Sequence, residues 1–129
     1  RDLFIVEGSA DAPVGVISWG STAGVAIEAF HLAIAQGLRV KLLVPKLLYP
    51  VSEQVYQEFF ASLKRGLVVE QNHQSQLFRL LRMYVDVPRG IEQLAKSGSN
   101  PITPGEVVDR LKQISLALQR ERQQEPSGV

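Results

Sequence analysis

The sequence predicts an α/β domain in which a mostly parallel sheet is covered by helices on both faces. Three short apolar runs, at residues 14–18, 38–44 and 67–70, are typical of strands that are buried on both sides. Amphipathic segments at residues 22–37, 52–64 and 75–85 alternate with these runs. Because crossovers between parallel strands are right-handed, this alternation predicts helices on both sides of one sheet.

The elements in chain order begin with residues 3–6 (LFIV), a candidate edge strand, and residues 91–96 are a weaker one. The first helix is expected to bury one stripe of side chains and to end at Gly37, in the position that favours glycine. That stripe consists of Ala23, Ala26, Ile27, Phe30, Ala33 and Ile34.

The second and third helices have similar apolar stripes. Ser52 is expected to be the N-cap of the second helix, with Glu53 in its first turn. Its stripe is Val55, Tyr56, Phe59, Phe60 and Leu63, and that of the third helix is Leu77, Leu80, Leu81 and Tyr84.

The last helix has the clearest start, because Thr103 and Glu106 are spaced as a capping box with Pro104 at the first helical position. Its apolar positions are Val107, Leu111, Ile114 and Leu118. The apolar period then stops. We therefore expect one domain over residues 1–118 and a frayed polar tail over residues 119–129.

The composition is typical of one globular domain of cytoplasmic origin. Of 129 residues, 45% are hydrophobic and 21% are charged, and the net charge is +1. This balance argues against a nucleic-acid-binding protein, and no apolar run approaches the about 18 residues that span a membrane. Residues 1–13 hold only a four-residue apolar run, which is too short for a signal peptide. The sequence starts at Arg1 without a methionine, so we interpret it as a fragment or as a processed form.

The residue types exclude several kinds of chemistry. The sequence contains no cysteine, and therefore no disulfide, no thiolate nucleophile and no cysteine ligand for an iron–sulfur cluster or zinc. The two histidines, His31 and His73, are far apart and have no carboxylate at metal-ligand spacing. We expect no metal site and no catalytic residue in this chain.

A candidate binding crevice lies where the parallel strands end, since ligands of such sheets gather at the carboxyl ends of the strands. The side chains expected there are Ser21, Thr22, Lys46, Glu70 and Asn72. The turn at residues 20–22 precedes a helix N-terminus, which suits an anion, yet neither the G-x-G-x-x-G fingerprint nor the P-loop motif is present. We favour a structural corner in which Ser21 or Thr22 caps the helix.

Glu70 is the one candidate for a general base, provided that it is buried. Its favoured role is to cap the next helix or to pair with an arginine. On the first helix, Val25 and Leu32 lie nearly opposite the buried stripe. Two aliphatic side chains one above the other on an outer face predict a docking surface for a neighbouring domain or subunit.

Four segments together are similar to one known family. They are VGVISWGSTAGVAIEAF, QGLRVKLLVPKLLYPVSEQV, GLVVEQNHQSQLFRLLR and SNPITPGEVVDRL. Their order and spacing resemble the C-terminal domain of the alpha subunit of 2-oxoacid:ferredoxin oxidoreductases over about residues 3–115. More distantly, the pattern is similar to the C-terminal domains of transketolase and of pyruvate dehydrogenase E1 beta chains.

The resemblance implies a three-layer α/β/α domain with a five-stranded mixed sheet and one antiparallel edge strand. It also implies a parent enzyme that decarboxylates a 2-oxoacid with thiamine diphosphate and magnesium, acylates coenzyme A, and passes electrons through iron–sulfur clusters to ferredoxin. The implied partners are the other domains of the subunit, a beta subunit and ferredoxin, and a homo-oligomer is left open. This domain itself is expected to bind none of the cofactors.

Two other functions stay open from the sequence. One is a free-standing module that binds a small anion or nucleotide through Ser21 and Thr22. The other is the equivalent domain of a transketolase or E1-type enzyme without a link to ferredoxin. The favoured function is a structural and assembly domain of the ferredoxin-linked enzyme.

Overall fold

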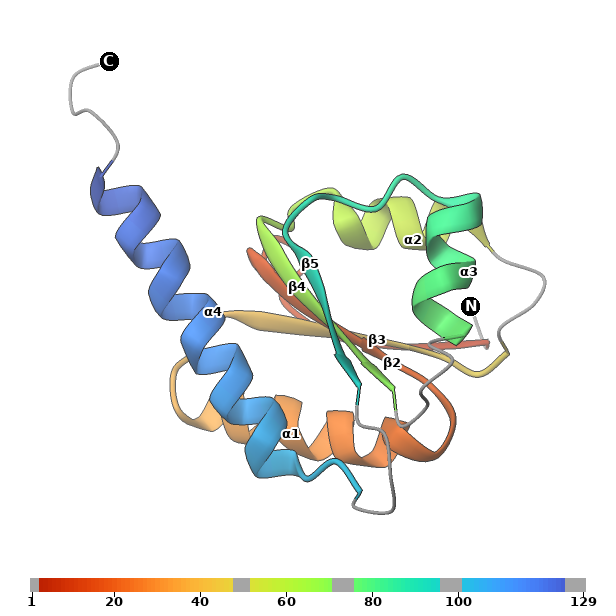
Figure 1. Ribbon diagram of the computed structural model, residues 1–129, viewed down its shortest axis with the longest axis horizontal. Helices are drawn as coiled ribbons and strands as arrows, with labels where there is room; N and C mark the ends of the chain where they lie inside the picture. The colour runs from red at the N-terminus through yellow and green to blue at the C-terminus, as the bar shows by residue number, and fades with distance from the viewer. Residues whose placement is uncertain (1–2, 48–51, 71–75, 96–100, 125–129) are drawn as a thin grey trace.

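The computed structural model describes residues 3–47, 52–70, 76–95 and 101–124. These ranges contain five strands and four α-helices, and after the first two strands the helices and strands alternate (Figure 1). They are β1 (Phe4–Gly8), β2 (Val14–Ser18), α1 (Ala23–Ala35), β3 (Val40–Pro45), α2 (Glu53–Phe60), β4 (Arg65–Glu70), α3 (Gln76–Tyr84), β5 (Ile91–Ala95) and α4 (Pro104–Gln124). A short 3-10 turn, Gly20–Thr22, connects β2 to α1.

The strands form one mixed sheet in the order β1-β3-β2-β4-β5. β1 pairs antiparallel with β3, and the other three pairings are parallel. Both candidate edge strands are therefore strands, Phe4–Gly8 and Ile91–Ala95, and each lies at an edge of the sheet. The α/β class, the mixed sheet and the antiparallel edge strand are all confirmed.

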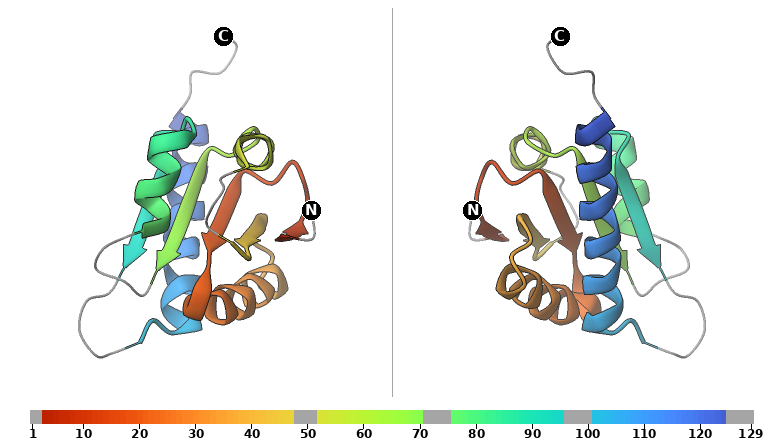
Figure 2. Two further views of the ribbon diagram at one scale, coloured as in Figure 1. Left: turned by 90° about the vertical axis from the view of Figure 1, so that its right-hand side faces the viewer. Right: turned by 90° about the vertical axis from the view of Figure 1, so that its left-hand side faces the viewer.

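The helices form two layers, one on each face of the sheet (Figure 2). Alternate side chains of the central strands supply both cores, because successive residues of a strand point to opposite faces. On one face α1 and α4 cover Val16, Leu42 and Leu67. On the other face α2 and α3 cover Ile17, Leu43 and Val68.

The buried face of α1 differs from the predicted stripe. Ala29 is fully buried, whereas Ile34 is 44% exposed and Ile27 packs only partly against the core. The reason is that α1 contacts α4 as well as β2 and β3, so its buried face is turned toward a second helix. The predicted stripe assumed that α1 packs against the sheet alone, so it did not include the side that faces α4.

Both ends predicted from local signals are present. Gly37 has φ +86, and the N–H groups of Gly37 and Leu38 donate to the carbonyls of Ile34 and Ala33, which closes α1 with a Schellman motif. At the start of α4, the Thr103 N–H donates to Glu106 Oε1 at 3.0 Å, and the Glu106 N–H donates to Thr103 Oγ1 at 3.2 Å. The capping box is therefore formed.

The predicted tail needs a correction. α4 continues to Gln124, so residues 119–124 are helical, and the remaining residues of the predicted tail, 125–129, lie outside the part of the chain that is described. Gln, Arg and Glu are good helix formers, and an ion pair between Glu121 and Arg65 at the start of β4 ties this end of the helix to the sheet. Loss of the apolar period marked the end of burial, not the end of the helix.

Candidate functional site

Polar side chains join the carboxyl ends of β2 and β4. The Ser18 hydroxyl donates to the Val69 carbonyl at 2.8 Å. The Thr22 Oγ1 lies 2.8 Å from Ser18 Oγ, 3.0 Å from the Trp19 carbonyl oxygen and 3.2 Å from the Val69 carbonyl oxygen. Both hydroxyl side chains are buried. Their hydrogen bonds are thus made within the fold.

Glu70 completes this cluster from the end of β4. Its Oε1 accepts hydrogen bonds from Trp19 Nε1 at 3.2 Å and from the Leu77 N–H at 2.8 Å. Its Oε2 accepts one from the Phe78 N–H at 3.0 Å. A carboxylate at the positive end of the α3 dipole is favourably placed, and Glu70 is only 1% exposed. Glu70 therefore caps α3, which is the role that the sequence favours.

We call Ser18, Trp19, Thr22, Val69 and Glu70 the strand-end cluster. It connects the ends of two strands to the beginnings of the two helices that follow them. Each of its four polar side chains has a hydrogen-bonding partner inside the cluster or in the first turn of α3, and Val69 contributes its backbone carbonyl. The arrangement can hold these elements in place, but it does not pair a nucleophile with a base.

The corner before α1 differs from the predicted cap. Gly20 has φ +65, which suits glycine, and no side-chain cap bond is formed by Thr22 at the start of α1. The Thr22 hydroxyl turns inward because the Trp19 and Val69 carbonyls are nearby acceptors. Ser21 is exposed.

The residues predicted to line one crevice do not all lie together in the structure. Thr22 and Glu70 lie together in the strand-end cluster, whereas Ser21 and Lys46 are exposed. Asn72 lies outside the described residues. In the ranges that are described, no group of three or more His, Cys, Asp or Glu side chains could hold a metal ion.

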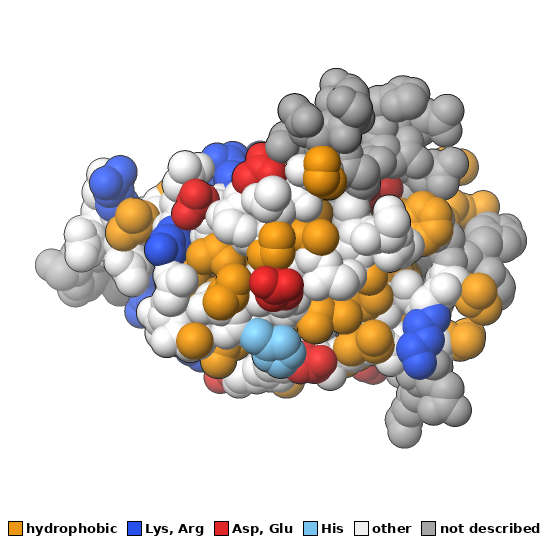
Figure 3. All heavy atoms as spheres, turned by 90° about the horizontal axis from the view of Figure 1, so that it is seen from below, with side chains coloured by type: hydrophobic (Ala, Val, Ile, Leu, Met, Phe, Trp, Pro, Cys, Tyr) orange, Lys and Arg blue, Asp and Glu red, His pale blue; other side chains and the backbone are white. Residues whose placement is uncertain are grey.

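The two candidate docking residues of α1 differ in their exposure to solvent. Leu32 is 41% exposed, while Val25 packs partly against the core beneath it. Ile34, expected in the core, is the second exposed aliphatic side chain of this helix. Figure 3 views the molecule from the α1 side, where hydrophobic side chains are interspersed with a few charged ones.

The sequence reasoning missed Ser18, Trp19 and Lys41. Lys41 lies within β3, is 3% exposed, and donates from Nζ to the Ala10 carbonyl at 3.0 Å. Burial lowers its pKa, and the attraction of the Asp11 carboxylate offsets this only partly. The signal was present, because a lysine inside an otherwise apolar buried strand needs a partner.

Comparison with known proteins defines the class first. No family model matches the sequence. The alpha chain of a probable 2-oxoacid ferredoxin oxidoreductase from Thermoplasma acidophilum superposes with a TM-score of 0.60 at 19% identity, covering 90% of this chain and 99% of that one. A split-gene transketolase gives 0.65 at 17% identity, covering 91% of this chain and 42% of that one. The chain has the transketolase C-terminal-like fold.

Two relatives of higher sequence identity indicate which family with this fold the chain resembles. A 2-oxoglutarate:ferredoxin oxidoreductase from Magnetococcus marinus superposes with a TM-score of 0.80 at 38% identity over 86% of this chain. Subunit alpha of 2-oxoacid:ferredoxin oxidoreductase 2 from Aeropyrum pernix is 28% identical over 114 residues, which is 88% of this chain. The chain resembles the alpha subunit of 2-oxoacid:ferredoxin oxidoreductase, and it spans 19% and 18% of those two relatives.

Proposed function

We propose that this chain is the structural and assembly domain of the alpha subunit of a 2-oxoacid:ferredoxin oxidoreductase. The observation that carries the proposal is the 38% identity over 86% of the chain to the Magnetococcus marinus enzyme, together with a TM-score of 0.80. The domain contributes by packing, since its strand-end cluster is engaged in internal hydrogen bonds.

The chemistry of the parent enzyme is assigned to other domains. It is the oxidative decarboxylation of a 2-oxoacid with thiamine diphosphate and magnesium, giving an acyl-coenzyme A and electrons for ferredoxin. The Magnetococcus marinus enzyme is described with 2-oxoglutarate, coenzyme A and succinyl-CoA bound. This chain has no cysteine for a cluster, and its described residues include no group of three or more His, Cys, Asp or Glu side chains that could hold a metal ion.

The partners proposed for this domain are the other domains of its subunit and a beta subunit, with ferredoxin reached through the complex. The exposed Leu32 on α1 supports a contact on that face, with Val25 at its border. A cytoplasmic location is part of the proposal and is supported by the cysteine-free sequence. In the described ranges, none of the helices combines the length and apolar character that a bilayer crossing requires.

The test is to tag the gene that encodes this chain and purify its product from the source cells. The expected product is a complex with iron–sulfur absorbance that reduces methyl viologen when supplied with a 2-oxoacid and coenzyme A. A product without clusters, or one that shows no 2-oxoacid-dependent reduction, would refute the assignment.

The assembly role is tested in the same complex with Leu32→Arg. We expect the variant subunit to fold but to assemble less completely, because a charge cannot be buried in an apolar contact without a partner. Gln57→Arg, on an exposed position of α2 on the other face, is the matched control. Unchanged assembly of the Leu32 variant would remove α1 from the docking surface.

A further inference from the structure

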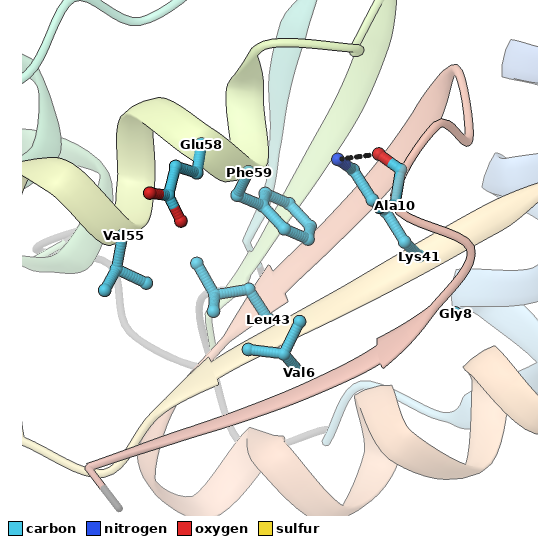
Figure 4. Close-up of a pocket in the computed structure, with 8 residues that line it drawn as sticks. All are labelled: Val6, Gly8, Ala10, Lys41, Leu43, Val55, Glu58 and Phe59. Carbon is cyan, nitrogen blue, oxygen red and sulfur yellow. Dashed lines mark hydrogen bonds between the residues drawn. The ribbon is translucent and has the colours of Figure 1, made fainter. Parts of the chain in front are cut away.

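A cavity of about 200 Å³ lies between the edge strand β1, its neighbour β3 and helix α2 (Figure 4). Its lining residues are Val6, Gly8, Ala10, Lys41, Leu43, Val55, Glu58 and Phe59. Val6 is 60% exposed, so the cavity opens to solvent at the free edge of the sheet. A cavity of roughly 150 Å³ is sufficient for benzene. This one is large enough for a small organic molecule.

The ammonium of Lys41 lies at one end of this cavity. Its Nζ donates to the Ala10 carbonyl at 3.0 Å and sits 4.7 Å from the centroid of the Phe59 ring. An ammonium has three donors, and the part of the chain that is described offers it this one hydrogen-bond acceptor and no carboxylate within ion-pair distance. The Asp11 carboxylate attracts it from beyond that distance and offsets the cost of burial only in part, so an anion placed directly at the ammonium would be favourable.

The opposite end of the cavity has different chemistry. Figure 4 shows the Glu58 carboxylate on the far side of the Phe59 ring from the Lys41 nitrogen. Glu58 accepts a hydrogen bond from Gln54 Nε2 at 3.1 Å on the same helix. The walls between the two ends are the apolar side chains of Val6, Leu43 and Phe59.

We propose that this cavity binds a small monocarboxylic acid with a short branched or ring-shaped apolar body. The carboxylate would join the Lys41 ammonium in a charge-assisted hydrogen bond, and the apolar body would lie along Val6, Leu43 and Phe59. Glu58 would repel a second carboxylate at the far end, which selects against dicarboxylic acids. The inference rests on the cavity and not on the function proposed above.

The experiment follows the amide NMR spectrum of the full chain during titration with 3-methylbutanoate. We expect saturable shifts at Gly8, Ala10 and Lys41, with a millimolar dissociation constant. The uncharged 3-methylbutanamide tests the need for the carboxylate, and butanedioate tests the repulsion by Glu58. We expect both to bind at least about tenfold more weakly.

Variants separate a binding role of Lys41 from a merely structural one. Lys41→Met keeps the length of the side chain and removes the charge, and it should weaken 3-methylbutanoate binding by about tenfold or more. Lys64→Met removes a charge from an exposed position and should bind normally. Val6→Phe fills the cavity from its exposed side and keeps the ammonium, so it decides the matter if the Lys41 variant fails to fold.

The proposal is overturned by any of four results. These are the absence of saturable shifts, equal binding of acid and amide, normal binding by the Lys41→Met or Val6→Phe variant, and shifts confined to another surface. In each case the Lys41 ammonium would serve only to hold the Ala10 loop against β3.

Discussion

The buried carboxylate of Glu70 accepts three hydrogen bonds, from Trp19, Leu77 and Phe78. Glu70→Gln places an amide NH₂ where one oxygen accepts, so at least one buried donor loses its partner. We expect the free energy of unfolding to fall by about 1–3 kcal/mol, measured by urea denaturation. Glu28→Gln, at an exposed position of α1, should change it by less than about 0.5 kcal/mol. Equal effects of the two changes would contradict the capping role.

Thr22 and Ser21 are neighbours with opposite environments, which makes them a matched pair. Thr22→Val removes a buried hydroxyl that bonds across to β4, and we expect a loss of about 1–2 kcal/mol of stability. Ser21→Ala should be nearly neutral, because Ser21 is exposed.

Calorimetric titration with phosphate or a nucleotide should give no saturable heat in either variant or in the parent chain. Submillimolar phosphate binding that Ser21→Ala abolishes would instead favour the anion-binding module.

Tyr56 is expected to make the free energy of unfolding depend on pH in the alkaline range. Burial raises the pKa of Tyr56 to about 12, whereas an unfolded tyrosine titrates near 10. Between about pH 10 and 12 the unfolded chain therefore binds fewer protons than the folded one, and stability falls as the pH rises. Tyr56→Phe should flatten this part of the curve of unfolding free energy against pH. A curve of unchanged slope in the variant would assign the decline to other groups.

For individual residues, the sequence predicts the role of one side chain better than it predicts which side chains lie together. The capping role of Glu70 follows from its place between a strand and a helix. The involvement of Ser18 and Trp19 does not, because their partners Val69 and Glu70 are distant in sequence and meet them only through the pairing of β2 with β4. The sequence does not identify the partner of Lys41, because Ala10 lies in a loop that only the β1–β3 pairing brings near.

Substitutions at two glycines, Gly24 and Gly37, test where helix α1 begins and ends. Gly37 closes the helix with φ +86, a conformation that costs a residue with a side chain roughly 1–2 kcal/mol. Gly24 lies in the first turn, and a Cβ there would meet nothing within 4 Å. Gly24→Ala should therefore stabilise the chain by up to about 1 kcal/mol, and Gly37→Ala should destabilise it by a similar amount. Thermal denaturation of both variants gives the comparison, and shifts of the same sign would mean that the helix ends elsewhere.

Elements were predicted well where a local signal sets them, and less well where their packing does. The capping box at Thr103 and the glycine after α1 rest on hydrogen bonds within a few residues, so the sequence is sufficient. The buried face of α1 and the length of α4 depend on contacts with other elements. Helix α1 packs against α4 as well as against the sheet, and the ion pair of Glu121 reaches back to Arg65.

The architecture of the whole molecule follows from the order of its elements. Short apolar runs separated by amphipathic helices permit few arrangements, since parallel crossovers are right-handed and both faces of the sheet need a cover. The antiparallel β1 was implied by family resemblance rather than by that rule. Residues 3–6 alone do not specify a direction of pairing, because the long connection from β1 to its partner β3 permits either direction.

For the molecule as a whole we predict that the isolated chain folds but is catalytically silent. Folding is expected because each face of the sheet has its own buried core and both helix-end motifs are formed. Silence is expected because thiamine chemistry needs the diphosphate held on a metal, and electron transfer needs clusters that a cysteine-free chain cannot ligate.

The measurement pairs a thermal shift assay with an activity assay on the same preparation. The melting temperature should not change with thiamine diphosphate plus magnesium, nor with coenzyme A, because a ligand that binds only the folded chain would raise it. Reduction of methyl viologen by a 2-oxoacid should match a heat-inactivated control. A rise in melting temperature with either cofactor would mean that this domain holds part of the parent's catalytic machinery, and turnover above the control would mean that it holds enough of it to act alone.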